Sequence, residues 1–109
     1  MNEGLNKSDP GSELWTKVYR RSEELVTRKI TGELFIVPVS GNLANMQRMF
    51  ALTPVGEYIW ELFDGHRALS DMRKAVLDTY DVEKSQAESD IREFVAELLN
   101  AGLIREQTE

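Results

Sequence analysis

The pattern of apolar residues predicts three short strands in the first half of the chain. Residues 25–30 (LVTRKI) and 33–39 (ELFIVPV) carry the β-branched and aromatic side chains that suit a pleated sheet. The Thr-Gly pair between them suits a tight hairpin turn, in which the glycine takes a positive φ. The short apolar run at residues 49–52 (MFAL) predicts a third strand. We therefore expect a three-stranded antiparallel sheet.

In the second half of the chain, apolar residues recur with the period of a helix. Thr53 and Pro54 suit the N-cap and the first position of a helix. Apolar side chains at positions 55, 59, 62 and 63 then share one helical face, and Gly65 is placed to end the helix in the left-handed conformation. Because apolar side chains nearly encircle this helix, we expect it to lie at the centre of the core.

Two further helices are predicted downstream. The first covers residues 70–80, with Ser70 as its N-cap. The second begins at Ser85, where Ser-Gln-Ala-Glu forms a capping box, and it continues to residue 101 with a broad apolar stripe. Gly102 is expected to cap its C-terminus, and the next two residues to leave as a short extended piece.

Strands followed by helices are typical of an α+β fold. The last two helices resemble a helix-turn-helix, so a winged-helix-like domain is expected: a three-stranded antiparallel sheet followed by three helices. Residues 1–18 are expected to form a flexible tail, because their first thirteen are rich in Asn, Gly, Ser, Asp and Pro. Apolar residues at 14–19 allow that segment either to dock or to stay loose. Residues 106–109 are expected to fray.

The composition narrows the class of function. The length of 109 residues suits one domain, and the net charge of −6 argues against general attraction to nucleic acid or to an anionic membrane. The chain has no cysteine, which excludes disulfides, thiolate nucleophiles and cysteine-ligated metals. With no apolar segment typical of a signal peptide or a membrane span, the cytoplasm is the expected location.

No group of residues suggests an active site. The single histidine, His66, has no partner cysteine or second histidine and is expected in an exposed turn. Neither a Gly-x-Ser-x-Gly motif nor a glycine-rich phosphate loop occurs. The acidic residues of the last helix are spaced as a solvated face: Glu88, Asp90, Glu93 and Glu97. We therefore expect no catalytic residue, no metal and no cofactor, and interpret the chain as a binding module.

Two surface features bear on binding. A basic group stands out in this acidic chain and is either a solvated strand face or a contact for an acidic partner: Lys17, Arg20, Arg21, Arg28 and Lys29. The edge of a small sheet is a template for an incoming peptide strand unless it is covered. Residues 14–19 or a second copy of the chain are the candidates for covering it.

Three stretches of the chain follow one another in a distinctive order: VTRKITGELFIVPVSGN, then LTPVGEYIWELFDG at residues 52–65, then DIREFVAELLNAGLI at 90–104. Together they resemble the PqqD family. The resemblance covers residues 19–104. Leu52-Thr53 stands where the family often has Leu-Asn, and Phe63 stands where members of the PQQ pathway often have cysteine. This departure favours a PqqD-like protein of another pathway.

The resemblance implies a peptide-recognition domain over residues 19–105. Such domains bind the leader of a ribosomally made precursor peptide and present it to a modifying enzyme, commonly a radical SAM protein. The leader is added to the third strand, beside the third helix. The positions implied here are Arg48, Met49, Phe50, Ala51 and Leu52 on the strand, and Asp90, Ile91, Phe94 and Glu97 on the helix. Ile91 and Phe94 are first of all core residues, so the two acidic positions are the better probes.

Two alternatives remain at this point. A winged-helix module for nucleic acid or transcription is allowed by the topology, but four acidic residues against Arg92 make the third helix repel phosphate. A small enzyme or hydrolase subunit lacks a catalytic constellation. We expect a monomer or weak homodimer, with no nucleic-acid or membrane partner. The sequence does not specify the peptide, the enzyme or the modification.

Overall fold

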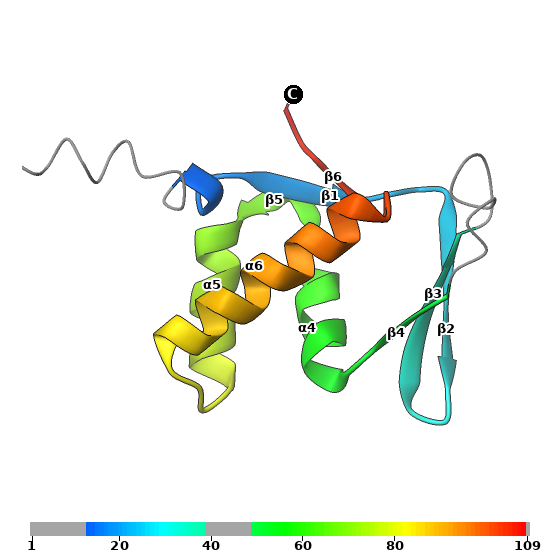
Figure 1. Ribbon diagram of the computed structural model, residues 1–109, viewed down its shortest axis with the longest axis horizontal. Helices are drawn as coiled ribbons and strands as arrows, with labels where there is room; N and C mark the ends of the chain where they lie inside the picture. Colours follow the sequence, from blue (N-terminus) through cyan, green and yellow to red (C-terminus); the bar gives the residue numbers. More distant parts are fainter. Residues whose placement is uncertain (1–12, 39–48, 109) are drawn as a thin grey trace, which may run out of the picture.

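The computed structural model describes residues 13–38 and 49–108. Its elements follow the order β1 (Val18–Arg21), β2 (Leu25–Ile30), β3 (Glu33–Pro38), β4 (Phe50–Leu52), α4 (Pro54–Leu62), β5 (Asp64–Ala68), α5 (Leu69–Thr79), α6 (Lys84–Asn100) and β6 (Ile104–Glu106). The sheet formed by β2, β3 and β4 lies at one end of the molecule, with α5 and α6 toward the other end and α4 between them (Figure 1). The fold is therefore α+β, as predicted.

The strands form two three-stranded sheets, one of which the sequence predicted and one of which it did not. The order β2-β3-β4 is the expected antiparallel sheet. The second sheet has the order β5-β1-β6 and is also antiparallel. Its strands come from three distant parts of the chain, and two of them are polar or very short, as in DGHRA and IRE. Such strands are stabilised by their pairing with β1 rather than by their own propensity.

The β2–β3 hairpin has the predicted turn. Thr31 and Gly32 both have positive φ, at 52° and 84°, as a two-residue type I′ turn requires. From this turn the register pairs Arg28 with Phe35 and, on the other side of β3, Leu34 with Leu52. Side chains alternate across the sheet, so Leu34, Ile36 and Leu52 are buried on its inner side.

Helix α4 begins where the sequence predicts. Thr53 is its N-cap, with its side-chain hydroxyl accepting a hydrogen bond from the Gly56 N–H at 3.0 Å, and Pro54 follows. The helix ends at Leu62, and the next residue, Phe63, is almost fully buried. Gly65 has the expected positive φ of 83°, but it lies inside β5 rather than in a terminating turn.

The two later helices begin differently from the prediction. Helix α5 starts at Leu69, and the Asp71 carboxylate accepts a hydrogen bond from the Ala68 N–H, so Ser70 is not the cap. Helix α6 starts before Ser85, and Glu88 pairs with Arg73 at 2.7 Å instead of completing a capping box. At the other end, the prediction for Gly102 is confirmed: it has a φ of 77° and closes the last turn of α6.

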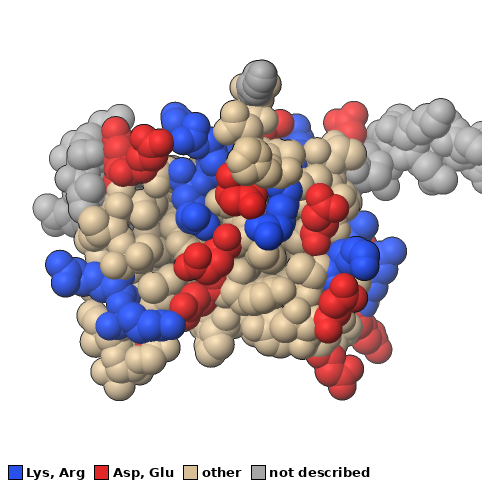
Figure 2. Space-filling view, turned by 180° about the vertical axis from the view of Figure 1, so that it is seen from behind, with Lys and Arg blue, Asp and Glu red and all other residues tan. Residues whose placement is uncertain are grey.

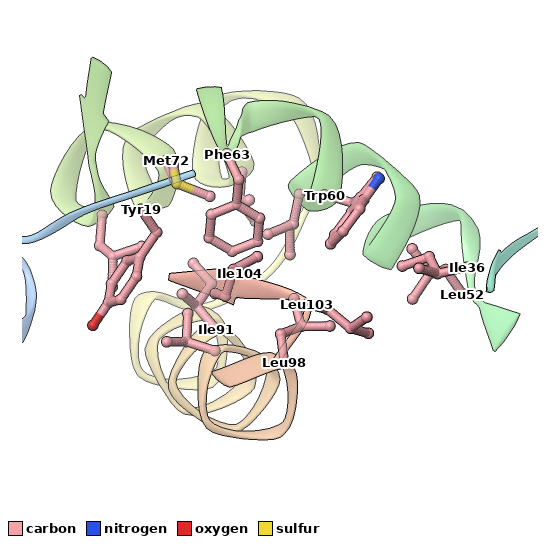
Figure 3. Packing of buried hydrophobic residues seen from close by; sticks show 14 of the residues in the cluster. Tyr19, Ile36, Leu52, Trp60, Phe63, Met72, Ile91, Leu98, Leu103 and Ile104 are labelled. Carbon is pink, nitrogen blue, oxygen red and sulfur yellow. The ribbon is translucent and has the colours of Figure 1, made fainter. Parts of the chain in front are cut away.

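The core joins both sheets to all three helices. Phe63 lies at its centre, in edge-to-face contact with the rings of Tyr19 and Trp60 at 6.4 Å between centroids in each case (Figure 3). Leu103 and Ile104, which follow α6, are fully buried below these rings. This packing fixes the end of α4 against β1 and α6.

The segment that precedes β1 docks on the domain. Trp15 is only 7% exposed and lies beneath the guanidinium groups of Arg73 and Arg92, at 4.6 and 5.6 Å from its ring centre. Its carbonyl accepts a hydrogen bond from the Ser70 N–H at 2.9 Å. Since β1 then enters the β5-β1-β6 sheet, the segment at residues 14–19 does not cover β4.

Four of the five residues of the basic group have partners within the fold. Lys17 pairs with Glu106, Arg20 with Glu23 and Lys29 with Glu57, while the Arg21 guanidinium donates to the carbonyls of Trp60 and Glu61 at the end of α4. The structure thus favours the reading of these positions as a solvated, internally paired surface. The contacts of Arg21 also tie β1 to α4.

Asp64 organises the start of β5. Its carboxylate accepts hydrogen bonds from the backbone N–H groups of His66 and Arg67 at 2.9 and 3.1 Å, and it pairs with the Arg67 guanidinium at 2.8 Å. Burial alone raises the pKa of this carboxyl. The hydrogen bonds and the positive charge outweigh burial and hold the pKa of Asp64 below its usual range.

We predict that Asp64 makes the stability of the fold depend on pH in the acidic range. In the unfolded chain it titrates near its ordinary pKa of about 3.9, above its pKa in the folded protein. Its stabilising contribution is therefore complete above that value and is lost as the pH falls through the folded pKa. Urea denaturation between about pH 2.5 and 6 gives the free energy of unfolding at each pH. As the pH falls, this free energy should decrease less for Asp64→Asn than for the wild type. Parallel curves would contradict the prediction.

Candidate functional site

Strand β4 is the last strand of its sheet in the part of the chain that the structure describes. It pairs with β3 on one side, and no described strand pairs with its other side. Leu52 points into the core, Ala51 is exposed on the outer face, and Met49 just before the strand is 61% exposed. An end strand of this kind presents backbone N–H and C=O groups to an incoming strand.

A groove lies where β4 runs into α4, between the first turns of that helix and the middle of α6. Its main hollow has a volume of about 330 Å³ and is lined by Thr53, Val55, Gly56, Ile59, Asp90, Glu93, Phe94 and Glu97. A smaller hollow of about 130 Å³ shares Val55, Ile59 and Asp90 with it and extends toward α5. The two hollows therefore adjoin each other, and together we call them the groove between α4 and α6.

Gly56 allows β4 and α4 to meet closely at the end of this groove. A Cβ atom at this position would lie 3.3 Å from the Thr53 hydroxyl and 3.6 Å from the Leu52 Cβ. The glycine therefore lets the first turn of α4 pack directly on the last residue of β4. This contact places the end of the strand and the wall of the groove side by side.

The groove has an apolar floor and an acidic rim. Ile59 is buried and Phe94 half-buried, while Val55 is 39% exposed at the open side. Every charged residue of the lining is acidic, and all three are exposed on α6: Asp90, Glu93 and Glu97. The Gln86 side-chain amide donates a hydrogen bond to Asp90 at 2.9 Å. The groove can thus hold apolar side chains below and polar or cationic groups above.

The structure brings together only part of the predicted site. Asp90, Phe94 and Glu97 line the main hollow. Ile91 borders the smaller one but is fully buried, so it is a core residue. The β4 residues, Phe50 to Leu52, do not line the groove themselves but lead into it through Thr53. Arg48 lies outside the described residues.

The lining contributed by α4 was not predicted. Val55 and Ile59 fall on the apolar face of the helix and were interpreted as core alone, and Glu93 was placed on the solvated face of α6. The signal available in the sequence was local: Thr53, the N-cap of α4, directly follows β4, which places the first turn of the helix next to the end of the strand. The missed positions are Thr53, Val55, Gly56, Ile59 and Glu93.

The remaining candidate chemistry is sparse within the described ranges 13–38 and 49–108. They contain no cluster of three His, Cys, Asp or Glu residues that could hold a metal ion. His66 is exposed, as predicted, but it lies in β5 and not in a turn. Across the same ranges, no helix combines the length and the apolar character that a membrane span requires.

The surface opposite α6 carries charges of both signs. In the view from behind, groups of Lys and Arg side chains lie among groups of Asp and Glu side chains, with other residues between them (Figure 2). A nucleic-acid-binding surface requires a concentrated positive patch to attract phosphates. The described residues of this face do not form such a patch, and the rim of the groove on α6 is acidic. The alternative of a nucleic-acid-binding module therefore finds no support on the described part of either surface.

Comparison with known proteins agrees with this geometry. A family model described as "Coenzyme PQQ synthesis protein D (PqqD)" matches residues 33–104, about two thirds of the chain. The chain belongs to the PqqD family. The match begins at β3 and ends at the first residue of β6, so it contains β4, α4 and α6 and hence the whole groove. No curated protein sequence matches the chain.

Two solved structures share the PqqD-family fold seen here. A protein described as "Lasso peptide synthetase B1 complexed with the leader peptide" is 17% identical, with a TM-score of 0.66 over 80% of this chain and 96% of that one. A second, "TbiB1 in Complex with the TbiA(beta) Leader Peptide", is 24% identical, with a TM-score of 0.65 over 79% and 94%. Sequence identities of 24% and 17% establish that the fold is shared, and no more than the fold.

We predict that buried and rim residues of α6 respond differently to substitution. Ile91→Ala removes a fully buried side chain and should lower the free energy of unfolding by about 2–5 kcal/mol. Glu97→Gln alters an exposed rim position and should change it by no more than about 0.5 kcal/mol. Urea denaturation of both variants tests this difference. Comparable destabilisation by the two would show that Glu97 is part of the structural core and not a groove residue.

Proposed function

We propose that this protein binds the leader segment of a ribosomally made precursor peptide. The leader adds as a strand to the edge of β4, and its side chains enter the groove between α4 and α6. The observation that carries the proposal is the position of the groove beside an end strand. Strand addition uses main-chain hydrogen bonds for affinity and alternate side chains for selectivity. Here the edge of β4 offers the hydrogen bonds, and the groove offers the pockets for side chains.

The dimensions of the site favour side-chain recognition over backbone pairing. Strand β4 has three residues and therefore offers about 10 Å of ladder at about 3.3 Å per residue. So short a ladder supplies few hydrogen bonds, and the net contribution of each is only about 1 kcal/mol. The apolar floor, with Val55, Ile59 and Phe94, then provides the larger part of the binding free energy by burying side chains of the leader.

The family and its structural neighbours support this reading. Both neighbours of the same fold are described as complexes with leader peptides, and this chain spans at least 94% of the length of each. The groove residues on α4 and α6 fall inside the part of the chain that matches the PqqD family. A leader peptide is therefore the ligand class that agrees with both the local geometry and the family.

We further propose that the domain acts together with a separate peptide-modifying enzyme. A radical SAM enzyme is the class that the PqqD resemblance suggests, since PqqD-like domains commonly present precursor peptides to such enzymes. By holding the leader at β4, the domain raises the effective concentration of the attached core peptide near the enzyme. Its own contribution is binding and orientation, not bond-making.

We predict that filling the groove weakens leader binding without unfolding the protein. Val55 is 39% exposed at the open side of the groove, so a Val55→Trp side chain occupies the space meant for the ligand. Titration of the ¹⁵N-labelled wild type with leader peptides encoded beside its gene should shift amides at residues 49–52 and 90–97. The variant should bind the same peptide at least about tenfold more weakly, equivalent to about 1.4 kcal/mol.

Val26→Trp is the matched control, because Val26 is 42% exposed on β2, at the other edge of the same sheet. This variant should bind as the wild type does. Equal weakening by both substitutions would place the ligand elsewhere. The absence of shifts in the wild type, at peptide concentrations well above micromolar, would refute the proposed function itself.

A further inference from the structure

The charge of the groove suggests what kind of leader it accepts. The two hollows together contain no Lys, Arg or His among their lining residues, whereas three carboxylates stand on the rim: Asp90, Glu93 and Glu97. Building on the proposed function, we propose that the bound strand is basic, with Lys or Arg at alternate positions that face α6. The structure assigns Glu93 and Glu97 as the residues that select this charge.

These two carboxylates have no cation of their own in the described part of the chain. Nearby basic side chains of α5 and α6 are used elsewhere: Arg73 pairs with Glu88 at 2.7 Å, and the Arg92 guanidinium lies over the ring of Trp15. No ion pair within the described residues involves Glu93 or Glu97. As like charges four residues apart on one helix they repel each other, and a cationic ligand relieves that repulsion.

The spacing of the carboxylates fits an extended peptide. Glu93 and Glu97 are separated by about 6 Å along the helix axis, at 1.5 Å per residue. Alternate residues of a strand lie about 6.7 Å apart and point to the same side. Two basic residues at positions i and i+2 of the added strand can therefore each approach one carboxylate. Positions i+1 and i+3 point away from α6.

Lys and Arg side chains also suit a groove with an apolar floor and an acidic rim. Their aliphatic stems can cover the half-buried Phe94 and the exposed side of Val55, while their charged ends reach the solvent-exposed rim. A short polar side chain leaves the floor uncovered, and an apolar one leaves the rim carboxylates without counter-charges. The whole chain adds to this preference, because its net charge of −6 attracts a cationic peptide and repels an anionic one.

A phage-display selection tests the inference. The full chain serves as bait, and the library displays random 12-residue peptides. The same selection is carried out with Glu93→Gln/Glu97→Gln and with the control Glu23→Gln/Glu24→Gln. The control changes the net charge by the same amount in the exposed link between β1 and β2, away from the groove. Binders from each selection are then titrated into the labelled wild-type protein, to establish whether they shift the amides of β4.

We expect wild-type binders to be enriched in Lys or Arg at alternate positions and to shift the β4 amides. Each rim carboxylate should contribute about two- to fivefold to their affinity, as exposed ion pairs do, and added salt should reduce it. The enrichment should disappear with Glu93→Gln/Glu97→Gln and persist with the control. Binders that shift β4 without basic enrichment, or with the same enrichment for all three proteins, would overturn the inference and leave the proposed function standing. If no binder shifts β4, the proposed function fails, and the inference fails with it.

Discussion

The packing of Phe63 is the interaction on which the rest of the structure depends. Its ring contacts Tyr19 from β1, Trp60 from α4 and Phe94 from α6, with centroid distances of 6.4 Å in all three pairs. One buried side chain thus connects the second sheet and two helices. Because only Thr53, the N-cap of α4, separates β4 from the helix, fixing the C-terminal end of α4 also fixes the strand edge at its other end. The groove is the space left between these constrained elements.

Some residues of the groove also belong to the core, whereas others lie only at its exposed rim. Phe94 belongs to the groove through one side of its ring and to the core through its contact with Phe63. Ile59 is similarly both floor and core. Such positions cannot vary without a cost in packing. Selectivity between peptides therefore falls to the exposed positions, which are the rim carboxylates of α6 and Val55, where a new side chain leaves the fold intact.

Local chemistry explains what could be predicted from the sequence and what could not. The hairpin turn at Gly32, the cap at Thr53 and the helix end at Gly102 each follow from a few adjacent residues, and all three are present. The β5-β1-β6 sheet was missed because its strands are short, polar and far apart in sequence, so only the folded chain brings them together. The resemblance to the PqqD family pointed to Asp90, Phe94 and Glu97 on α6. The opposite wall on α4 was interpreted as core alone, because an apolar helix face suits either role.

The central claim is that β4 and the adjoining groove accept an added strand. Isotope-filtered nuclear Overhauser measurements on the labelled protein with an unlabelled bound peptide test it most directly. We expect cross-strand contacts between backbone protons of the peptide and those of residues 50–52, together with side-chain contacts to Val55 and Phe94. Contacts confined to β2, or to the surface opposite α6, would contradict it.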